Sequence, residues 1–417
     1  MDILRFLTAG SVDDGKSTLI GRLLYDSKSI LQDQLAAIQR QTKNRAAGEV
    51  DLALLTDGLR AEREQGITID VAYKYFSTPN RKFIIADAPG HIQYTRNMVT
   101  GASNAELIII LIDARHGVVE QTRRHSLIAS LLNIQHVVVA VNKMDLVNYS
   151  EDVFNNIVID YADVVTRLGL NNVTYIPMAA LTGDNVVDRS AQMDWYAGEP
   201  LLTFLEKVSV ASSLNLTIGR FPVQYVIRPQ AEDLHDYRGY AGKVVSGVYR
   251  VGDVVRVYPS GLSSTIVRIE RNGIDVDEVF APQSAILHIA DDLDISRGDV
   301  LVPARDQPLV VSKSIQASIC WMAQRPLQAR QTYWLQVNSR LVRVMVQAID
   351  HRLDVHTLEQ QTGIDILQMN EVGQVQLKAA SELPFDPYYT LPANGGGILI
   401  DETSHVTVGA VMLRIAL

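Results

Sequence analysis

A glycine-rich segment near the start of the chain constrains its fold more than any other feature. The residues from Gly10 to Ser17 match the pattern G-x-x-x-x-G-K-[ST], in which backbone N–H groups surround phosphate oxygens. An apolar run of strand length, Ile3 to Ala9, precedes the segment, and apolar residues at helical spacing follow it from Ser17 to Leu24. A strand, a glycine loop and a helix in this order predict a nucleoside triphosphate site. A turn with an ordinary salt-bridging lysine is the alternative, and it does not explain these flanks.

Two residues of this loop have specific predicted roles. Lys16 is expected to contact the β- and γ-phosphates during catalysis, and the hydroxyl of Ser17 is expected to bind a magnesium ion. The helix that follows adds the partial positive charge of its N-terminus. The predicted phosphate site comprises Gly10, Ser11, Val12, Asp13, Asp14, Gly15, Lys16, Ser17 and Thr18.

The composition indicates a globular, cytoplasmic protein. The 417 residues suffice for about three domains, and 47% of them are hydrophobic. Cys320 is the single cysteine, so no intrachain disulfide forms, and its expected role is that of a small buried apolar side chain. The chain opens directly on the first strand, which leaves no room for a targeting peptide, and apolar runs such as Leu107 to Ile112 are too short to span a membrane.

The net charge of −9 and the absence of a dense Lys/Arg tract argue against nucleic acid as a partner, although a local basic patch is compatible with an acidic total.

Residues 1–210 alternate β-rich and helical stretches, which predicts an α/β domain with a mostly parallel sheet. A turn pattern from Tyr75 to Arg81 predicts a hairpin, so the second strand is expected to run antiparallel at an edge. The strands expected after the first are Val71 to Phe76, Phe83 to Ala86, Leu107 to Asp113, His136 to Asn142 and Val173 to Met178, and the clearest helices are Gln121 to Leu132, Val153 to Leu168 and Leu201 to Val208.

From Phe221 onward the pattern changes to short β-branched runs separated by Gly, Pro, Asp and Asn, which predicts small β-barrels. Two prolines between Val302 and Pro308 bracket a charged stretch and divide this part in two. The predicted architecture is therefore an α/β P-loop domain (1–210) followed by two small β-barrel domains (211–305 and 306–417).

A second motif follows the expected strand Phe83 to Ala86, so that Asp87 lies at a carboxyl end, where α/β sheets bind ligands. Asp87 is the expected carboxylate that supports the magnesium ion from outside its direct ligands, and Gly90 would let a backbone N–H approach the γ-phosphate. His91 is the candidate catalytic residue that orients the attacking water. In isolation it would be interpreted as a capping or surface histidine. The motif comprises Asp87, Ala88, Pro89, Gly90 and His91.

A third motif, Asn142-Lys143-Met144-Asp145, predicts which base is bound. A carboxylate at Asp145 can accept hydrogen bonds from N1–H and the exocyclic amine of guanine, whereas adenine has no donor at either position. The expected ligand is GTP or its product GDP. In isolation the motif could also be a polar turn after a strand.

Thr68, in the segment Gln65 to Ile69, precedes the second strand and fits a switch threonine whose hydroxyl completes the magnesium coordination and supports catalysis. Ordinary strand chemistry is the alternative for a lone threonine, and the order of the motifs favours the functional role.

Together with the two barrels, these motifs resemble the translational GTPase superfamily. The amino-acid sequences of the motifs are most similar to those of one branch, the large GTPase subunits of bacterial sulfate adenylyltransferases. The stretches that carry the resemblance are Ser11 to Thr18, Ala61 to Asp70, Tyr94 to Met98, Asp113 to Arg115, Gln121 to His125 and, as a closing strand, Thr407 to Ala410.

The resemblance implies further site residues, and at one of them, Ala179, this chain departs from the family pattern. Ala179, Ala180 and Leu181 would form the third guanine contact, and Val12 with Ile67 would flank the catalytic water. Relatives usually carry serine where Ala179 stands, but because the contact is thought to come through backbone N–H, binding is expected to survive. Elongation factors usually show histidine at the position of Asp14 and lysine at that of Arg96.

The resemblance also implies GTP hydrolysis coupled to formation of adenosine 5′-phosphosulfate and pyrophosphate from ATP and sulfate. No H-x-G-H nucleotidyltransferase signature is present, so a separate small catalytic subunit is expected to perform the adenylyl transfer as a partner. Two alternatives remain at this point: an elongation-factor-like protein that delivers aminoacyl-tRNA, and a regulatory GTP-binding module without a coupled reaction.

Overall fold

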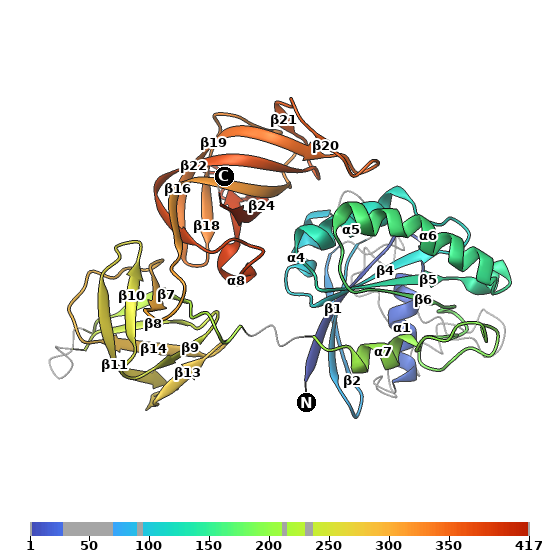
Figure 1. Cartoon of the computed structure of the whole chain (residues 1–417), viewed down its shortest axis with the longest axis horizontal. Helices are drawn as coiled ribbons and strands as arrows, with labels where there is room; N and C mark the ends of the chain where they lie inside the picture. The colour runs from blue at the N-terminus through green and yellow to red at the C-terminus, as the bar shows by residue number, and fades with distance from the viewer. Residues whose placement is uncertain (1, 28–69, 90–94, 211–214, 230–236, 416–417) are drawn as a thin grey trace. The chain divides into compact units, whose positions relative to one another are not determined.

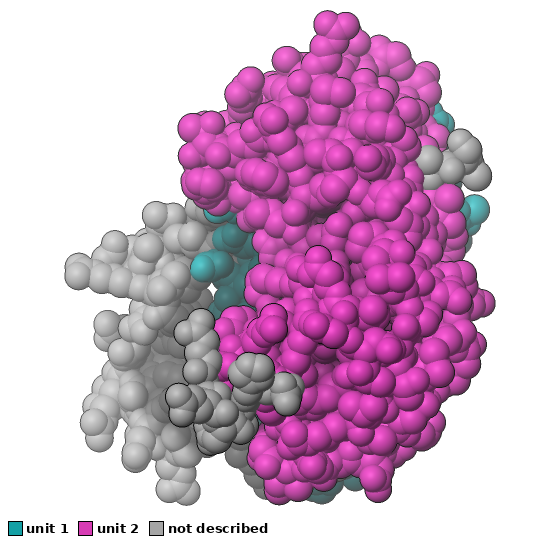
Figure 2. Space-filling view, turned by 90° about the vertical axis from the view of Figure 1, so that its left-hand side faces the viewer, with its two compact units in different colours: residues 1–211, 354–359 teal, residues 212–353, 360–417 magenta. Residues whose placement is uncertain are grey.

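A computed structural model describes residues 2–27, 70–89, 95–210, 215–229 and 237–415. The chain forms two compact units, which Figure 2 shows in different colours. The first consists of Met1–Ala211 with Asp354–Glu359, and the second of Ser212–Leu353 with Gln360–Leu417. In the described ranges, no helix combines the length and the apolar character that crossing a bilayer requires.

The first unit is built on a six-stranded sheet in the order β2-β3-β1-β4-β5-β6 (Figure 1). Five strands run parallel, whereas β2 pairs antiparallel with β3 at the edge. The strands are β1 (Ile3–Ala9), β2 (Ala72–Ser77), β3 (Lys82–Asp87), β4 (Leu107–Asp113), β5 (His136–Asn142) and β6 (Val173–Pro177).

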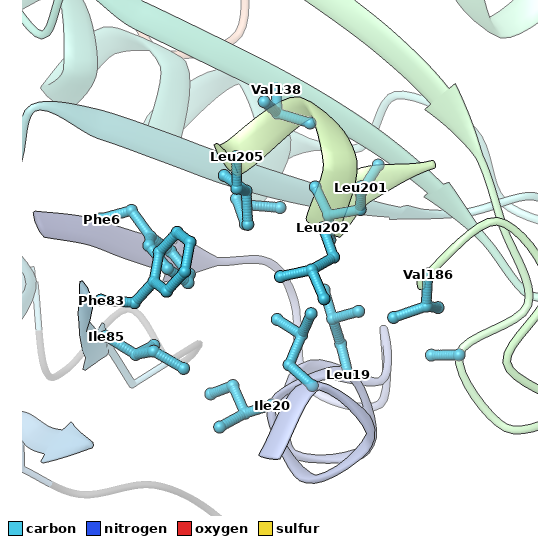
Figure 3. Packing of buried hydrophobic residues seen from close by; sticks show 14 of the residues in the cluster. Phe6, Leu19, Ile20, Phe83, Ile85, Val138, Val186, Leu201, Leu202 and Leu205 are labelled. Carbon is cyan, nitrogen blue, oxygen red and sulfur yellow. The ribbon is translucent and has the colours of Figure 1, made fainter. Parts of the chain in front are cut away.

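Helices cover both faces of this sheet (Figure 1). They are α1 (Lys16–Asp26), α4 (Thr95–Ala102), α5 (Glu120–Leu131), α6 (Glu151–Leu168) and α7 (Leu201–Lys207). Because both faces are covered, every residue of the central strand β4 is buried, and the strand is a continuous apolar run from Leu107 to Ile112. On one face, Leu19 and Ile20 of α1 and Leu205 of α7 pack against Phe6 of β1 and Phe83 of β3 (Figure 3). This packing fixes α1, and with it the glycine loop that precedes the helix.

The second unit contains two closed antiparallel barrels. In each, the first and last strands of a six-strand series also pair with each other, which removes the exposed sheet edges. The first barrel contains β7 (Phe221–Ile227), β8 (Gly239–Lys243), β10 (Val254–Tyr258), β11 (Ser263–Arg271), β14 (Ser284–Ile289) and β15 (Val300–Pro303). The second contains β16 (Val310–Trp321), β18 (Thr332–Val337), β19 (Arg340–Leu353), β22 (Val372–Phe385), β23 (Gly396–Ile400) and β24 (Thr407–Arg414).

A buried ion pair joins the two barrels. Arg220, just before β7, donates from Nε and Nη2 to the two carboxylate oxygens of Asp386, each at 2.8 Å. The guanidinium also donates to the carbonyls of Gly219 and Gln307, and Asn394 Nδ2 donates to Asp386. The side chains of Arg220 and Asp386 are only 1% and 7% exposed. Nearly every hydrogen-bonding group of the pair is thus satisfied, as burial of two charges requires.

The predicted α/β P-loop domain followed by two barrels is confirmed, including the antiparallel edge strand and the closing strand that begins at Thr407. Cys320 is buried, as expected. Thr68, Gly90 and His91 lie outside the described residues. The domain boundaries at 210/211 and 305/306 stay predictions.

We expect Arg220→Ala to destabilise the second unit by about 3–5 kcal/mol, because Asp386 would remain buried without its cation. The measurement is urea unfolding of the whole chain. Arg250→Ala is the control, since its ion pair with Glu278 is half exposed and is expected to contribute less than about 1 kcal/mol. Equal losses in the two variants would contradict the role given to the buried pair.

Candidate nucleotide-binding site

The predicted motifs meet at one edge of the parallel sheet, where β1, β3, β4 and β5 end. Strand β1 lies between β3 and β4, so the strands that follow it in the sequence are added to the sheet on both sides of β1. Such a position in an open α/β sheet opens a crevice at the carboxyl ends of the strands, and ligands bind there. The glycine loop directly follows β1 and therefore lies at this end of the sheet.

The glycine loop has the geometry of a phosphate cradle. Gly15 has φ +92°, a conformation that glycine adopts without strain, and α1 begins at the next residue. A Cβ added to Gly15 would come within 2.5 Å of Asn142 Nδ2. Lys16 lies across the loop, and its Nζ donates to the carbonyls of Gly10 at 2.9 Å and Ser11 at 2.8 Å.

Lys16 is a buried cation in this cradle. Its pKa is lowered, because burial outweighs the opposite effect of the nearby carboxylates of Asp87, Asp14 and Asp13. A buried ammonium is costly unless anions surround it. The residues therefore fit an anionic ligand such as a triphosphate, whose charge would stabilise the protonated lysine. The α1 N-terminus contributes in the same direction.

The structure explains why an aspartate is accommodated at position 14. Asp14 is buried, and its Oδ2 accepts a hydrogen bond of 2.5 Å from the backbone N–H of Ser11. Burial raises the pKa of Asp14. The Asp14 carboxylate thus bonds to the backbone of Ser11 and stabilises the turn of the glycine loop.

Asn142, the last residue of β5, connects two loops. Its Nδ2 donates to the carbonyl of Asp14 in the phosphate loop at 2.8 Å, and its Oδ1 accepts from the N–H of Ala180, after β6, at 2.9 Å. The side chain is 2% exposed. One amide therefore holds the predicted phosphate loop and the predicted base loop together.

A charged cluster orients the base motif. Lys143 has φ +62°, and its Nζ lies 3.0 Å from Asp113 Oδ2 at the end of β4. Burial raises the pKa of Asp113, but hydrogen bonds from Arg115 and Lys143 outweigh burial and hold this pKa well below its usual range. The carboxylate is therefore charged at neutral pH and restrains Lys143. Asp145 follows on the same turn and is half-buried.

The predicted magnesium carboxylate, Asp87, ends β3 and is 2% exposed. Its Oδ1 accepts a hydrogen bond of 3.2 Å from the hydroxyl of Thr8 in β1. With the hydroxyl of Ser17 at the start of α1, the crevice offers the oxygen donors that magnesium prefers. The other predicted residues of this centre, Thr68 and His91, are outside the described residues.

The turn after β6 matches the predicted third base contact in position. Ala179 and Ala180 are buried, whereas the side chain of Leu181 is 67% exposed. Their roles in binding stay predictions. The predicted position of Val12 and Ile67 beside the catalytic water also stays a prediction, since Val12 is exposed and Ile67 is not described.

Three residues of this region had no predicted role from the sequence: Thr8, which donates to Asp87; Asp113, which holds Lys143; and Arg22, which contacts the turn after β6. The sequence could have indicated a role for Asp113, because this residue ends a buried strand, as Asp87 does, and the two parallel strands end on the same side of the sheet.

Comparison with known proteins assigns the family. The elongation factor Tu GTP binding domain family model matches residues 1–217, and the GTP-eEF1A C-terminal domain-like model matches residues 314–414. Sulfate adenylyltransferase subunit 1 of Cellvibrio japonicus is 52% identical, over 99% of this chain and 86% of the relative. The chain belongs to the sulfate adenylyltransferase subunit 1 family.

The bifunctional enzyme CysN/CysC of Mycobacterium tuberculosis is 51% identical, over 99% of this chain and 67% of that protein. The Saccharomyces cerevisiae Ski7 GTPase-like domain bound to GTP shares the fold, with a TM-score of 0.53 and 18% identity over 100% of this chain and 98% of that one. As a family member, this chain is an enzyme subunit with GTPase activity, and its first unit binds guanine nucleotides.

We expect Asp145→Asn to shift preference from guanine toward xanthine nucleotides by at least about a hundredfold, because an amide can donate to the C2 carbonyl of xanthine. Competition between GDP and xanthosine diphosphate measures the shift. Asp152→Asn, an exposed carboxylate on α6, is the control. Unchanged GDP affinity in Asp145→Asn would remove Asp145 from the site.

A buried histidine near the site makes the fold sensitive to acid. His125 of α5 is 3% exposed, and burial, together with the positive charges of Lys16 and Arg124, lowers its pKa to about 3. Among the described residues its Nδ1 has no hydrogen-bond partner. The folded state therefore keeps this ring neutral, whereas the unfolded chain takes up a proton near pH 6.5. Stability falls as pH decreases below that value.

His125→Gln is accordingly expected to reduce the loss of unfolding free energy between about pH 7.5 and about pH 5 by about 2 kcal/mol. Urea unfolding of the first unit at the two pH values provides the measurement. His116→Gln serves as the control, since that side chain is 65% exposed. Identical pH dependence in parent and His125→Gln would contradict the assignment.

Proposed function

We propose that this chain is the GTP-hydrolysing subunit of a cytoplasmic sulfate adenylyltransferase, in which GTP hydrolysis is coupled to formation of adenosine 5′-phosphosulfate and pyrophosphate. The observation that carries the proposal is the likeness over 99% of the chain to proteins named sulfate adenylyltransferase subunit 1. The site geometry supports the GTP-binding part of the proposal, because Asn142 contacts both the predicted phosphate loop and the predicted base loop.

The nucleotide would lie along the carboxyl edge of the sheet in the first domain (1–210), with the barrels (211–305 and 306–417) outside the chemistry. Its phosphates would contact the backbone of the loop from Gly10 to Thr18 and the ammonium of Lys16. Its base would contact Asp145 and the turn from Ala179 to Leu181.

The residues present fit a magnesium ion, since Ser17 and Asp87 supply oxygen donors next to a buried cation that needs anionic ligands. When bound, magnesium neutralises charge that develops on the phosphate oxygens. Ser17 and Thr68 would bind it through their hydroxyls. The Thr8 hydroxyl would orient the Asp87 carboxylate toward it.

Hydrolysis requires a water oxygen to attack the γ-phosphorus while the bond to the bridging oxygen of GDP breaks. His91 would orient that water, and Lys16 would stabilise charge on the bridging and terminal oxygens.

The adenylyl transfer is assigned to a partner subunit. In that reaction a sulfate oxygen attacks the α-phosphorus of ATP and pyrophosphate leaves. The sequence contains no H-x-G-H nucleotidyltransferase signature, and the name of the relatives, subunit 1, fits an assembly with a second subunit. A small nucleotidyltransferase subunit would bind the GTP-bound state of this chain more tightly than its GDP-bound state, and this difference in affinity would drive the coupling.

The test combines the chain with its cognate nucleotidyltransferase subunit, ATP and sulfate, and follows phosphate release from GTP beside adenylylsulfate formation, leaving out each component in turn. The chain alone should hydrolyse GTP slowly, and the complete mixture should raise both rates at least about tenfold. Asp145→Asn supplies an internal control, because xanthosine triphosphate rather than GTP should then drive both reactions.

Two outcomes would contradict the proposal. Stimulation by ribosomes but not by the nucleotidyltransferase subunit would favour an elongation-factor-like protein. Stimulation by neither would favour a regulatory GTP-binding module.

A further inference from the structure

An arginine of α1 reaches across to the turn that follows β6. The guanidinium of Arg22 donates from Nε to the carbonyl of Ala180 at 3.2 Å and from Nη2 to the carbonyl of Leu181. Its side chain is only 18% exposed, and Asp26, one helical turn further, lies 3.7 Å from its Nη1. These contacts join the helix behind the phosphate loop to the predicted base loop, over 158 residues of sequence.

The contact fixes the direction of a backbone donor. The carbonyl of Ala180 and the N–H of Leu181 belong to one planar trans peptide, so they point in opposite directions. Because Arg22 holds that carbonyl, the N–H of Leu181 is directed away from Arg22. The cationic partner also polarises the peptide and strengthens the N–H as a donor.

The remaining hydrogen bonds of the turn leave this donor available. The carbonyl of Ala179 accepts from the N–H of Gly183 at 2.8 Å, and the N–H of Ala180 donates to Asn142. Within the part of the chain that the structure describes, the N–H of Leu181 has no acceptor. The turn is thus restrained on both sides of one unpaired N–H.

We propose that Arg22 is a positioning residue for base selection: it orients the backbone N–H at Leu181 toward the C6 carbonyl oxygen of guanine. The inference rests on the guanine-nucleotide site proposed above and adds to it a residue outside the base motif. Guanine presents an acceptor at C6, whereas adenine presents an amine, which a fixed N–H repels. Asp145 reads the other edge of the base, N1–H and the 2-amino group.

Nucleotide analogues separate the two edges. GDP, 6-thio-GDP and inosine diphosphate would be titrated against the full chain by calorimetry. The sulfur of 6-thio-GDP is a weak acceptor at C6, and inosine diphosphate keeps the C6 oxygen but lacks the 2-amino group. We expect Arg22→Ala to weaken GDP about tenfold and 6-thio-GDP less than about twofold, because mainly the C6 contact is lost. The ratio of the GDP affinity to the inosine diphosphate affinity should stay the same as in the parent protein.

Two further variants make the result specific. Arg22→Lys keeps a cation but loses the two-point contact, so it should lower the GDP to 6-thio-GDP ratio about threefold. Arg189→Ala is the matched control, because Arg189 donates to the carbonyls of Ala197 at 3.0 Å and Gly198 at 2.8 Å and so restrains a loop in the same way elsewhere. Arg189→Ala should leave the ratios of the affinities for the three nucleotides unchanged.

Equal weakening of all three nucleotides by Arg22→Ala, or no change, would overturn the positioning role while leaving the guanine site intact. If Arg22→Ala does not fold, the ratio in Arg22→Lys decides, and an unchanged ratio overturns the proposal. A parent protein that binds no guanine nucleotide would overturn the proposed function as well.

Discussion

The nucleotide site depends on one buried amide. Asn142 ends a central strand and makes two hydrogen bonds in opposite directions, to the carbonyl of Asp14 and from the N–H of Ala180. An amide can do this because it carries a donor and an acceptor on one planar group. Its burial makes either bond costly to lose. The parts of the site that follow β1 and β6 are therefore held in register by the strand between them.

Charged side chains also contribute to the arrangement of the site. Lys16 is buried in the phosphate loop, and Asp113 holds Lys143 beside the base motif. Both arrangements place lysines where desolvation would be unfavourable without anions. The first lysine interacts with the carboxylates of Asp87, Asp14 and Asp13, whereas the second is paired directly with Asp113. The same principle applies in the second unit, where Asp386 pairs with Arg220 between the barrels.

The fold and the outline of the site could be predicted from sequence because both are encoded locally. The glycine loop from Gly10 to Ser17 and the motif at Asn142 are short patterns, and buried parallel strands are continuous apolar runs. The contacts of Thr8, Arg22 and Arg220 could not be predicted, since each joins residues at least 79 positions apart and the partner is chosen by packing. Such residues look like ordinary strand, helix or surface positions until the elements are assembled.

The most direct test of this account is the affinity of Asn142→Ala for GDP, measured by calorimetry beside the parent and Asn155→Ala, an exposed asparagine on α6. Loss of two buried hydrogen bonds is expected to weaken GDP by about 3 kcal/mol, or about a hundredfold, while Asn155→Ala binds like the parent. An Asn142→Ala affinity within about threefold of the parent would contradict the claim that this amide organises the site.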